Sequence, residues 1–155
     1  MRSFLKLLAL GAALMLGAAY STAALAADKD QVIKDRQALM KDQGRQWLVV
    51  RNYIQGKADQ AAAISAVESL TKSVPKVPDY FPPGTGGPSP GGKWGTKPEI
   101  WSEHDKFLAA DKKVADQVAT LDAAVKSGDK AKVAAAFKDL DICSGCHQTF
   151  RAKLQ

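Results

Sequence analysis

The sequence has few of the residues that build disulfide scaffolds and metal clusters. Its 155 residues include only two cysteines and two histidines. A scaffold stapled by several disulfides and a cysteine-rich zinc array both need more such residues than this. Both classes are therefore excluded, and any cysteine chemistry must come from one pair.

Proline is missing from most of the chain. All seven prolines lie between Pro75 and Pro98, and the rest is rich in Ala, Lys, Leu, Asp and Gln. No stretch shows the alternation of apolar and polar residues that is typical of a strand. This pattern predicts an all-α chain with one long loop at about residues 75–97.

Long apolar runs are also missing. The longest, Leu7 to Ala19, is shorter than the ~20 residues that a membrane-spanning helix needs. The basic residues Arg2 and Lys6 precede it, and Ala24-Leu25-Ala26, which has the small-x-small pattern of a cleavage site, follows it. This order favours a secretory signal peptide over a membrane anchor. We expect cleavage after residue 26, leaving a single exported, periplasmic domain at residues 27–155 with no membrane span.

A strong charge excess is absent as well. Signal cleavage would leave 20 basic residues against 16 acidic ones. The basic residues are spread along the chain rather than gathered in a stripe. No nucleic-acid partner is therefore expected.

Apolar residues recur at helical spacing in four segments outside the loop. Asp28 and Gln31 resemble a capping box that opens the first helix, and Gly56 is the expected stop. The second helix is expected to end at Pro75.

The third helix is expected to begin with Thr96 as N-cap and Glu99 three residues later, a second capping box. Gly128 and Asp129 predict a tight turn into the fourth helix. Short first and third connections predict an antiparallel up-down-up-down four-helix bundle. Three loop aromatics are expected to hold the loop to this bundle: Tyr80, Phe81 and Trp94.

The segment Cys143-Ser144-Gly145-Cys146-His147 carries the chemistry. Its C-x-x-C-H spacing is the attachment signature of c-type haem. Cysteines three residues apart lie on one side of a helical turn, so both can add to the vinyl groups of one porphyrin. The adjacent His147 then stands under the iron as an axial ligand.

Two other roles are open to these cysteines. A thioredoxin-like redox pair goes with a βαβ pattern, which this sequence lacks. A structural zinc site needs four ligands, and the only other histidine is distant in the sequence. Haem attachment is therefore the preferred interpretation.

The sixth position of the iron has two candidate ligands. After signal cleavage Met40 is the only methionine and His104 the only other histidine. His104 lies in a polar run, whereas Met40 lies on the apolar stripe of the first helix, one turn before Gly44, which would leave room for a flat macrocycle. Methionine also packs well in ordinary cores, so the pattern alone leaves the ligand open.

The sequence resembles the cytochrome c prime family and its low-spin relatives over essentially the whole mature chain. The resemblance rests on several short segments and single residues in order: Arg36-Gln37, Leu39-Met40-Lys41, Gly44-Arg45, Phe81-Pro82, Lys97-Pro98-Glu99-Ile100-Trp101, Phe107, Cys143-Ser144-Gly145-Cys146-His147 and Phe150-Arg151.

This resemblance implies a four-helix bundle with one covalent haem c between its helices near one end. The first-helix segment is most like the low-spin branch, in which a methionine binds the iron, and so implies Met40 as the sixth ligand. It also implies that Arg36 and Gln37 lie near the haem edge, where Arg36 pairs with a propionate; a solvated helix face is the alternative for Arg36. Arg151 is expected either to tune His147 or to favour the helix C-terminus as a cation.

We therefore expect a single-electron carrier with His147 and Met40 as axial ligands, serving unidentified redox partner proteins. If Met40 is not bound, the alternative is a five-coordinate protein that binds nitric oxide or carbon monoxide. An enzyme is not expected, because it would need an open iron and a distal acid–base group, and nothing near Met40 clearly supplies one. The resemblance implies either a monomer or a homodimer through the first two helices.

Overall fold

The computed structural model describes the backbone of residues 2–88, 94–139 and 142–153, and the side chains of residues 28–88, 94–138 and 145–153. The side chains of the predicted signal peptide, residues 1–26, therefore lie outside the described part. Among the residues searched, no helix combines the length and the apolar character that a membrane crossing requires.

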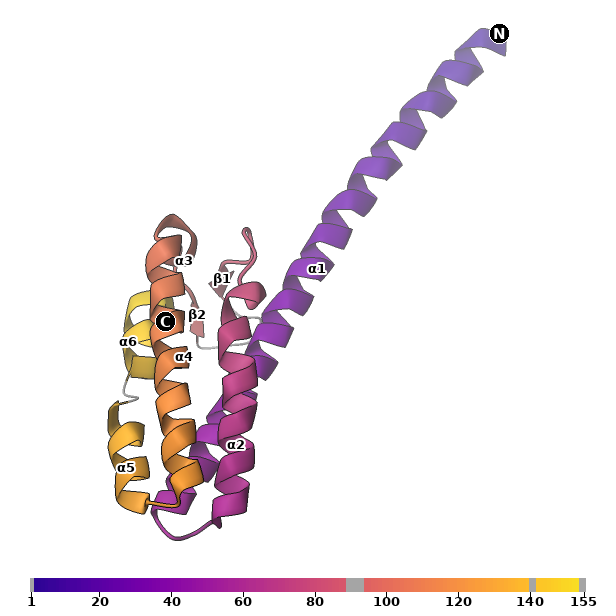
Figure 1. Ribbon diagram of the computed structural model, residues 1–155. Helices are drawn as coiled ribbons and strands as arrows, with labels where there is room; N and C mark the ends of the chain where they lie inside the picture. The colour runs from indigo at the N-terminus through magenta and orange to yellow at the C-terminus, as the bar shows by residue number, and fades with distance from the viewer. Residues whose placement is uncertain (1, 89–93, 140–141, 154–155) are drawn as a thin grey trace.

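Four helical rods form an antiparallel bundle (Figure 1). They are α1 (Arg2–Ile54), α2 (Gln60–Ser73), α4 (His104–Ser127) and a fourth rod divided into α5 (Lys130–Asp139) and α6 (Ile142–Phe150). A 3₁₀ helix, η1 (Val74–Tyr80), continues α2, and the short α3 (Glu99–Ser102) precedes α4. The predicted four-helix bundle is confirmed.

The α1–α2 and α4–α5 turns lie at the same end of the bundle, which we call the turn end (Figure 1). Gly56 follows the end of α1 with a φ of +72°, which confirms the predicted stop because glycine adopts this conformation without strain. Asp59 then caps α2 by accepting a hydrogen bond from the Ala62 amide at 2.7 Å.

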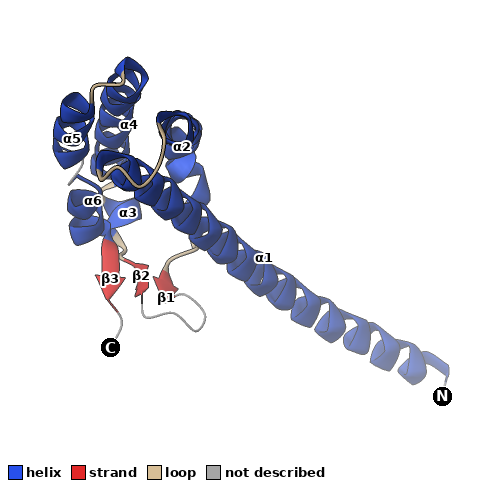
Figure 2. Cartoon of the chain, turned by 90° about the horizontal axis from the view of Figure 1, so that it is seen from below, coloured by secondary structure: helices blue, strands red, loops and turns tan. Residues whose placement is uncertain are grey.

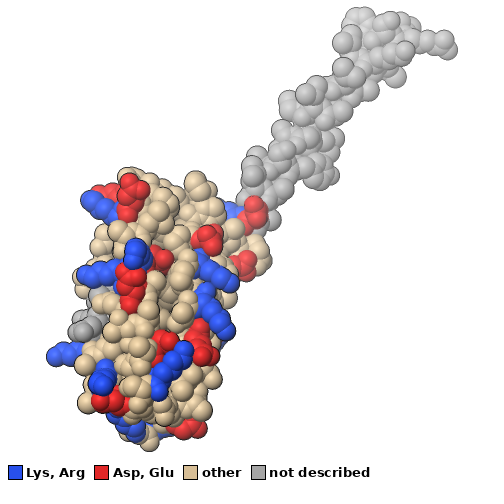
Figure 3. Space-filling model, in the orientation of Figure 1, with Lys and Arg blue, Asp and Glu red and all other residues tan. Residues whose placement is uncertain are grey.

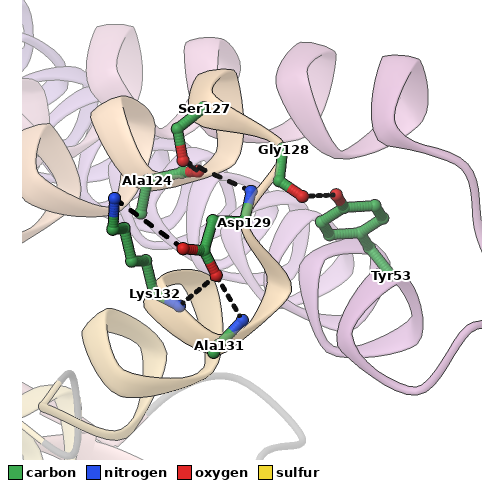
Figure 4. A network of polar contacts seen from close by, with 7 residues as sticks. All are labelled: Tyr53, Ala124, Ser127, Gly128, Asp129, Ala131 and Lys132. Carbon is green, nitrogen blue, oxygen red and sulfur yellow. Dashed lines mark hydrogen bonds and ion pairs between the residues drawn. The ribbon is translucent and has the colours of Figure 1, made fainter.

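The α4–α5 turn is also as predicted (Figure 4). Gly128 has a φ of +74°, and the Asp129 carboxylate accepts hydrogen bonds from the amides of Ala131 and Lys132 at 3.0 and 3.2 Å. The Tyr53 hydroxyl donates to the Gly128 carbonyl at 3.4 Å, which links this turn to α1.

Two predicted helix starts are wrong. Asp28 lies inside α1, because the Ala- and Leu-rich segment before it also favours a helix and nothing interrupts the backbone there. Thr96 does not cap the third helix; its hydroxyl accepts a hydrogen bond from the Gly87 amide at 3.2 Å instead. The helix begins at Glu99 and breaks at Glu103, which separates α3 from α4.

The fold is mostly helical as predicted, but it also contains three short strands that the sequence did not indicate. Three short strands, β1 (Gly87–Pro88), β2 (Trp94–Thr96) and β3 (Arg151–Lys153), form an antiparallel sheet in the order β1-β2-β3 (Figure 2). Strands of two or three residues are too short for an alternating pattern to be visible in the sequence. A Cβ at Gly95 would lie 2.7 Å from the Gly87 carbonyl oxygen, so glycine permits this close pairing.

The bundle has two separate hydrophobic clusters. The turn-end core consists of buried, mostly aliphatic residues: Val50, Tyr53, Ala63, Ala66, Val67, Leu70, Val74, Val114, Val118, Leu121, Val125 and Val133. The second, which we call the cavity-end cluster, consists of Val77, Phe81, Ile100, Phe107 and Phe150. The loop aromatic Phe81 is thus buried as expected, and Tyr80 packs against this cluster, whereas Trp94 is 41% exposed.

Candidate functional site

Helix α6 carries the C-x-x-C-H motif into the cavity-end cluster. Its last residue, Phe150, is buried and packs edge-on against Phe107, with ring centroids 5.4 Å apart. Cys146, one turn earlier, packs against the same cluster. This anchoring fixes the position of His147 beside it. The side chain of Cys143 lies outside the described residues.

A cavity of about 580 Å³ lies between α6 and α1. Cys146 and His147 line one side of it, and Arg36, Gln37, Met40 and Lys41 of α1 also line it. Residues spaced in this way share one face of a helix. The structure thus brings together all the predicted site residues whose side chains are described.

The two candidates for the sixth ligand differ in their position. Met40 is half-buried, lines the cavity and packs against the cavity-end cluster. His104 is exposed and does not line the cavity; its Nδ1 atom lies 3.2 Å from the Ile100 carbonyl oxygen. Gly44 is exposed and outside the cavity lining, so the expectation that it makes room for the cofactor is not supported.

Arg36 is not on a solvated helix face, because only 6% of it is exposed. Its guanidinium donates hydrogen bonds to the Tyr80 carbonyl at 2.7 Å and to the Thr85 carbonyl and hydroxyl at 3.2 and 2.6 Å. It also stacks on the Phe81 ring, with Cζ 4.1 Å from the centroid. Arg36 therefore ties the segment after η1 to α1.

Burial lowers the pKa of Arg36 to about 10, so the side chain stays charged at neutral pH. Lys41 and Arg151 add two further cations to the cavity lining, which contains no Asp or Glu among the described residues. The cavity is therefore electropositive, which suits a ligand that carries carboxylates.

Arg151 is the first residue of β3 and directly follows Phe150, the last residue of α6. Its guanidinium stacks on Trp94, with Cζ 3.8 Å from the ring centroid. Partial desolvation in the cavity, and next the charge of Arg151, lower the pKa of His147, although the residue as a whole still has exposed surface. The lowered pKa favours the neutral imidazole, which is the form that binds a metal.

These residues fit a haem. The cavity has the size of a small-molecule site, and its walls include Phe81, Phe107 and Phe150. It offers a thiol, an imidazole and a thioether, and its cations suit propionates. Cys146 and Cys143 would hold the group covalently, and His147 would bind the iron.

The sequence alone did not indicate several residues of the site. Val77, Trp94 and Thr96 line the cavity, and none of them was assigned a role there. Trp94 and Thr96 reach it because β2 pairs with β3 directly after the motif helix. The one available signal was the concentration of aromatic and glycine residues in the loop, which does not show where the loop packs.

A four-helix bundle that carries a C-x-x-C-H motif into an aromatic cavity defines a c-type cytochrome. The family model for Cytochrome C' matches residues 31–151. The chain belongs to the cytochrome c' family, whose members bind one covalent haem c and act as electron carriers or gas binders.

Known relatives agree with this assignment. Cytochrome c-556 of Rhodopseudomonas palustris is 32% identical over 144 residues, which cover 88% of this chain and 93% of that protein. Cytochrome c' of Rubrivivax gelatinosus is 39% identical over 102 residues, covering 64% and 77%. A solved nitric oxide complex of a mutant cytochrome c prime from Alcaligenes xylosoxidans has a TM-score of 0.71 at 30% identity and covers 81% of this chain and 97% of that one.

Proposed function

We propose that this chain is a single-electron carrier of the periplasm in which His147 and Met40 are the axial ligands of the haem iron. One observation carries the proposal: Met40 and His147 line the same cavity, and no other methionine or histidine of the described residues lines it. The resemblance to cytochrome c-556 supports it.

The bound haem would supply reversible one-electron chemistry between ferric and ferrous iron. The protein supplies the ligands and their surroundings. His147 is a neutral donor, and the soft thioether of Met40 favours the ferrous state. Phe81, Phe107 and Phe150 exclude water from one side of the cavity, and Arg36 offers a fixed cation for a propionate.

The test is the optical spectrum of the purified protein in both oxidation states. We expect six-coordinate, low-spin spectra in both states and the weak near-infrared band of a methionine–ferric bond. Met40→Leu keeps the apolar volume and removes the sulfur. It should give a high-spin spectrum, abolish the near-infrared band and open the ferrous protein to carbon monoxide.

His104→Ala is the matched control, since His104 lies near the same end of the bundle but outside the cavity lining. It should leave all these spectra unchanged. A high-spin wild-type protein would contradict Met40 ligation. A change in the His104 variant alone would instead indicate a bis-histidine site.

Gas binding is the second candidate function. Solved relatives include a nitric oxide complex of a mutant cytochrome c prime from Alcaligenes xylosoxidans and a nitrite complex of another mutant. If Met40 only packs beside the iron, the same cavity would admit a small gas. Carbon monoxide binding by the reduced wild-type protein distinguishes the two functions.

We also propose that residues 1–26 direct export and are removed. The basic start, the apolar run and the small residues before Ala27 support this. N-terminal sequencing of the protein from the periplasmic fraction should begin at Ala27. An intact leader on the haem-loaded protein would contradict the proposal.

A further inference from the structure

The small sheet places four side chains beside the cavity, of which Trp94 and Lys153 are exposed and Thr96 and Arg151 half-buried. Trp94 pairs with Lys153, and Thr96 pairs with Arg151, so these four side chains share one face of the sheet. Three of them, Trp94, Thr96 and Arg151, also line the cavity. This face is therefore continuous with the edge of the cofactor site.

The face and its surroundings are rich in cations, which we call the cationic rim: Lys41, Lys97, Arg151 and Lys153. Lys41 and Arg151 line the cavity, and the Lys97 ammonium donates to the Gln148 carbonyl of α6 at 3.0 Å. None of the four belongs to an ion pair within the described residues.

Few acidic groups lie near enough to neutralise this rim. Glu99 follows Lys97 by two residues, and one of its carboxylate oxygens is buried. Asp42, next to Lys41, is paired with Arg45 at 2.8 Å. Asp35 and Asp42 line a separate shallow groove beside Tyr80. The two propionates of the haem would offset part of this charge, and the four cations of the rim still leave it net positive.

Trp94 gives the rim an apolar centre. It is 41% exposed although it is large and aromatic, and the Arg151 guanidinium covers one of its faces at 3.8 Å. Tryptophan and arginine are the residues most enriched among those that dominate protein interfaces. A stacked Trp–Arg pair is already ordered, so a partner would lose little entropy in contacting it.

We propose that the cationic rim around Trp94 is the docking surface for a redox partner protein with an acidic surface. This inference rests on the proposed electron-carrier function. Opposite charges raise the rate of encounter, and docking here brings the partner to the edge of the cofactor cavity. The rate of electron transfer falls steeply with distance, so a partner that docks at this edge can exchange electrons with the cofactor most rapidly.

The test uses the full haem-loaded protein and reduced plant-type ferredoxin, a strongly acidic iron–sulfur protein. Its potential of about −400 mV makes it a reductant. One electron leaves the iron–sulfur cluster and converts the ferric cytochrome into the ferrous form, with no other reactant. The second-order rate constant is measured by stopped flow at low ionic strength and at about 1 M salt, where the screening length is only ~3 Å.

Lys153→Glu and Lys97→Glu reverse the charge at two points of the rim that lie outside the cavity lining. Each should slow the reaction about tenfold at low salt, at the lower end of the usual range for steering, and should equal wild type at high salt. Trp94→Ala should slow it at both salt concentrations, because it removes contact area rather than charge.

Lys57→Glu is the matched control, since Lys57 is exposed in the α1–α2 turn and the net charge changes equally. It should retain most of the wild-type rate at low salt. Reduction by a neutral deazaflavin radical should be equal in the wild type and the three lysine variants, whose positions lie outside the cavity lining, which shows that the cofactor itself is unaltered.

Two results would overturn the docking surface. Equal slowing by Lys57→Glu and the rim variants would mean that only net charge matters, and a wild-type rate that does not fall with salt would mean that no cationic surface guides the encounter. The ligand proposal is judged from the spectra alone, so either proposal can fail without the other.

Discussion

The two ends of the bundle differ in how their interiors are filled. At the turn end, aliphatic side chains fill the core, and the helix ends are capped by Asp59 and Asp129. At the cavity end, aromatic rings surround a space, and the backbone is built from short helices and strands. A densely packed end can stabilise the fold, whereas the other end must leave room for a cofactor.

The charges differ between the ends in the same way. Near the turn end, Lys126 contacts Asp122 at 2.9 Å and Glu68 at 3.6 Å, and Lys132 lies 3.7 Å from Asp129. The face shown in Figure 3 carries basic and acidic residues side by side. The described cavity lining has cations without carboxylates. The comparison indicates that the turn end is complete as a protein, whereas the cavity end is completed by its cofactor.

The largest effect should come from replacing both attachment cysteines, Cys143→Ala together with Cys146→Ala. Without the haem the cavity end loses its central packing, because the aromatic rings then border a void or water. We expect reduced helical circular dichroism and a lower melting temperature. Hydrogen exchange should become fast in α6 and η1 while α2 and α5 remain protected.

Extraction of the denatured wild-type protein with acidified organic solvent is the companion measurement. The haem should stay with the polypeptide after denaturation, because two thioether bonds hold it. A double variant that melts like the wild type, or protection lost equally at both ends, would contradict the division of the bundle.

Leu121→Ala should give the next largest effect, in the opposite region. Leu121 is fully buried in the turn-end core, so its truncation leaves a cavity. We expect a loss of about 2–5 kcal/mol in the free energy of unfolding, measured by denaturant titration. The optical spectra should not change, and Leu108→Ala, at a position 40% exposed on the same helix, should cost far less.

The accuracy of the sequence-based predictions also differs between the turn end and the cavity end. The turn end was predicted closely, because Gly56, Gly128 and Asp129 act through local conformation and capping. The motif in α6 and the candidate axial ligand Met40 could also be identified in the sequence, because their chemistry depends on residue type and helical spacing.

The cavity end was predicted less well because its structure depends on contacts between distant segments. The Thr96 hydroxyl was expected to cap the following helix, but it accepts a hydrogen bond from the Gly87 amide of β1 instead. The sequence left a solvated helix face open as an alternative for Arg36, and only the folded loop brings Thr85 and Tyr80 to it. No local pattern encodes such contacts.

Arg36→Lys should destabilise the cavity end by about 1–3 kcal/mol. A lysine keeps the charge but lacks the planar fork that reaches Tyr80 and Thr85 together, so buried acceptors lose their donor. Chemical denaturation measures the loss. Arg45→Lys is the control, because Arg45 is exposed and holds only the surface pair with Asp42.

The smallest effect should appear as a change in pH dependence at Asp111 of α4. Burial, and next the charge of Asp79 in η1, raise the pKa of Asp111 from 3.8 to about 6. The folded state therefore holds this proton more tightly than the unfolded state, and the carboxylate costs stability above the raised pKa. The stability that the tightly held proton gives the wild-type protein should be lost as the pH rises from about 4 to about 6.

Asp111→Asn removes the charge while keeping the shape, so it should stabilise the protein by about 1 kcal/mol at pH 7.5. At pH 4 or below the difference should shrink toward zero, because Asp111 is then protonated in the folded wild type. Asp116→Asn, an exposed position paired with Lys112 on the same helix, should show no such gain at pH 7.5. If Asp111→Asn instead destabilises the protein at pH 7.5, the Asp111 carboxylate makes a favourable contact. Its negative charge on α4 then does not lower the stability of the cavity end.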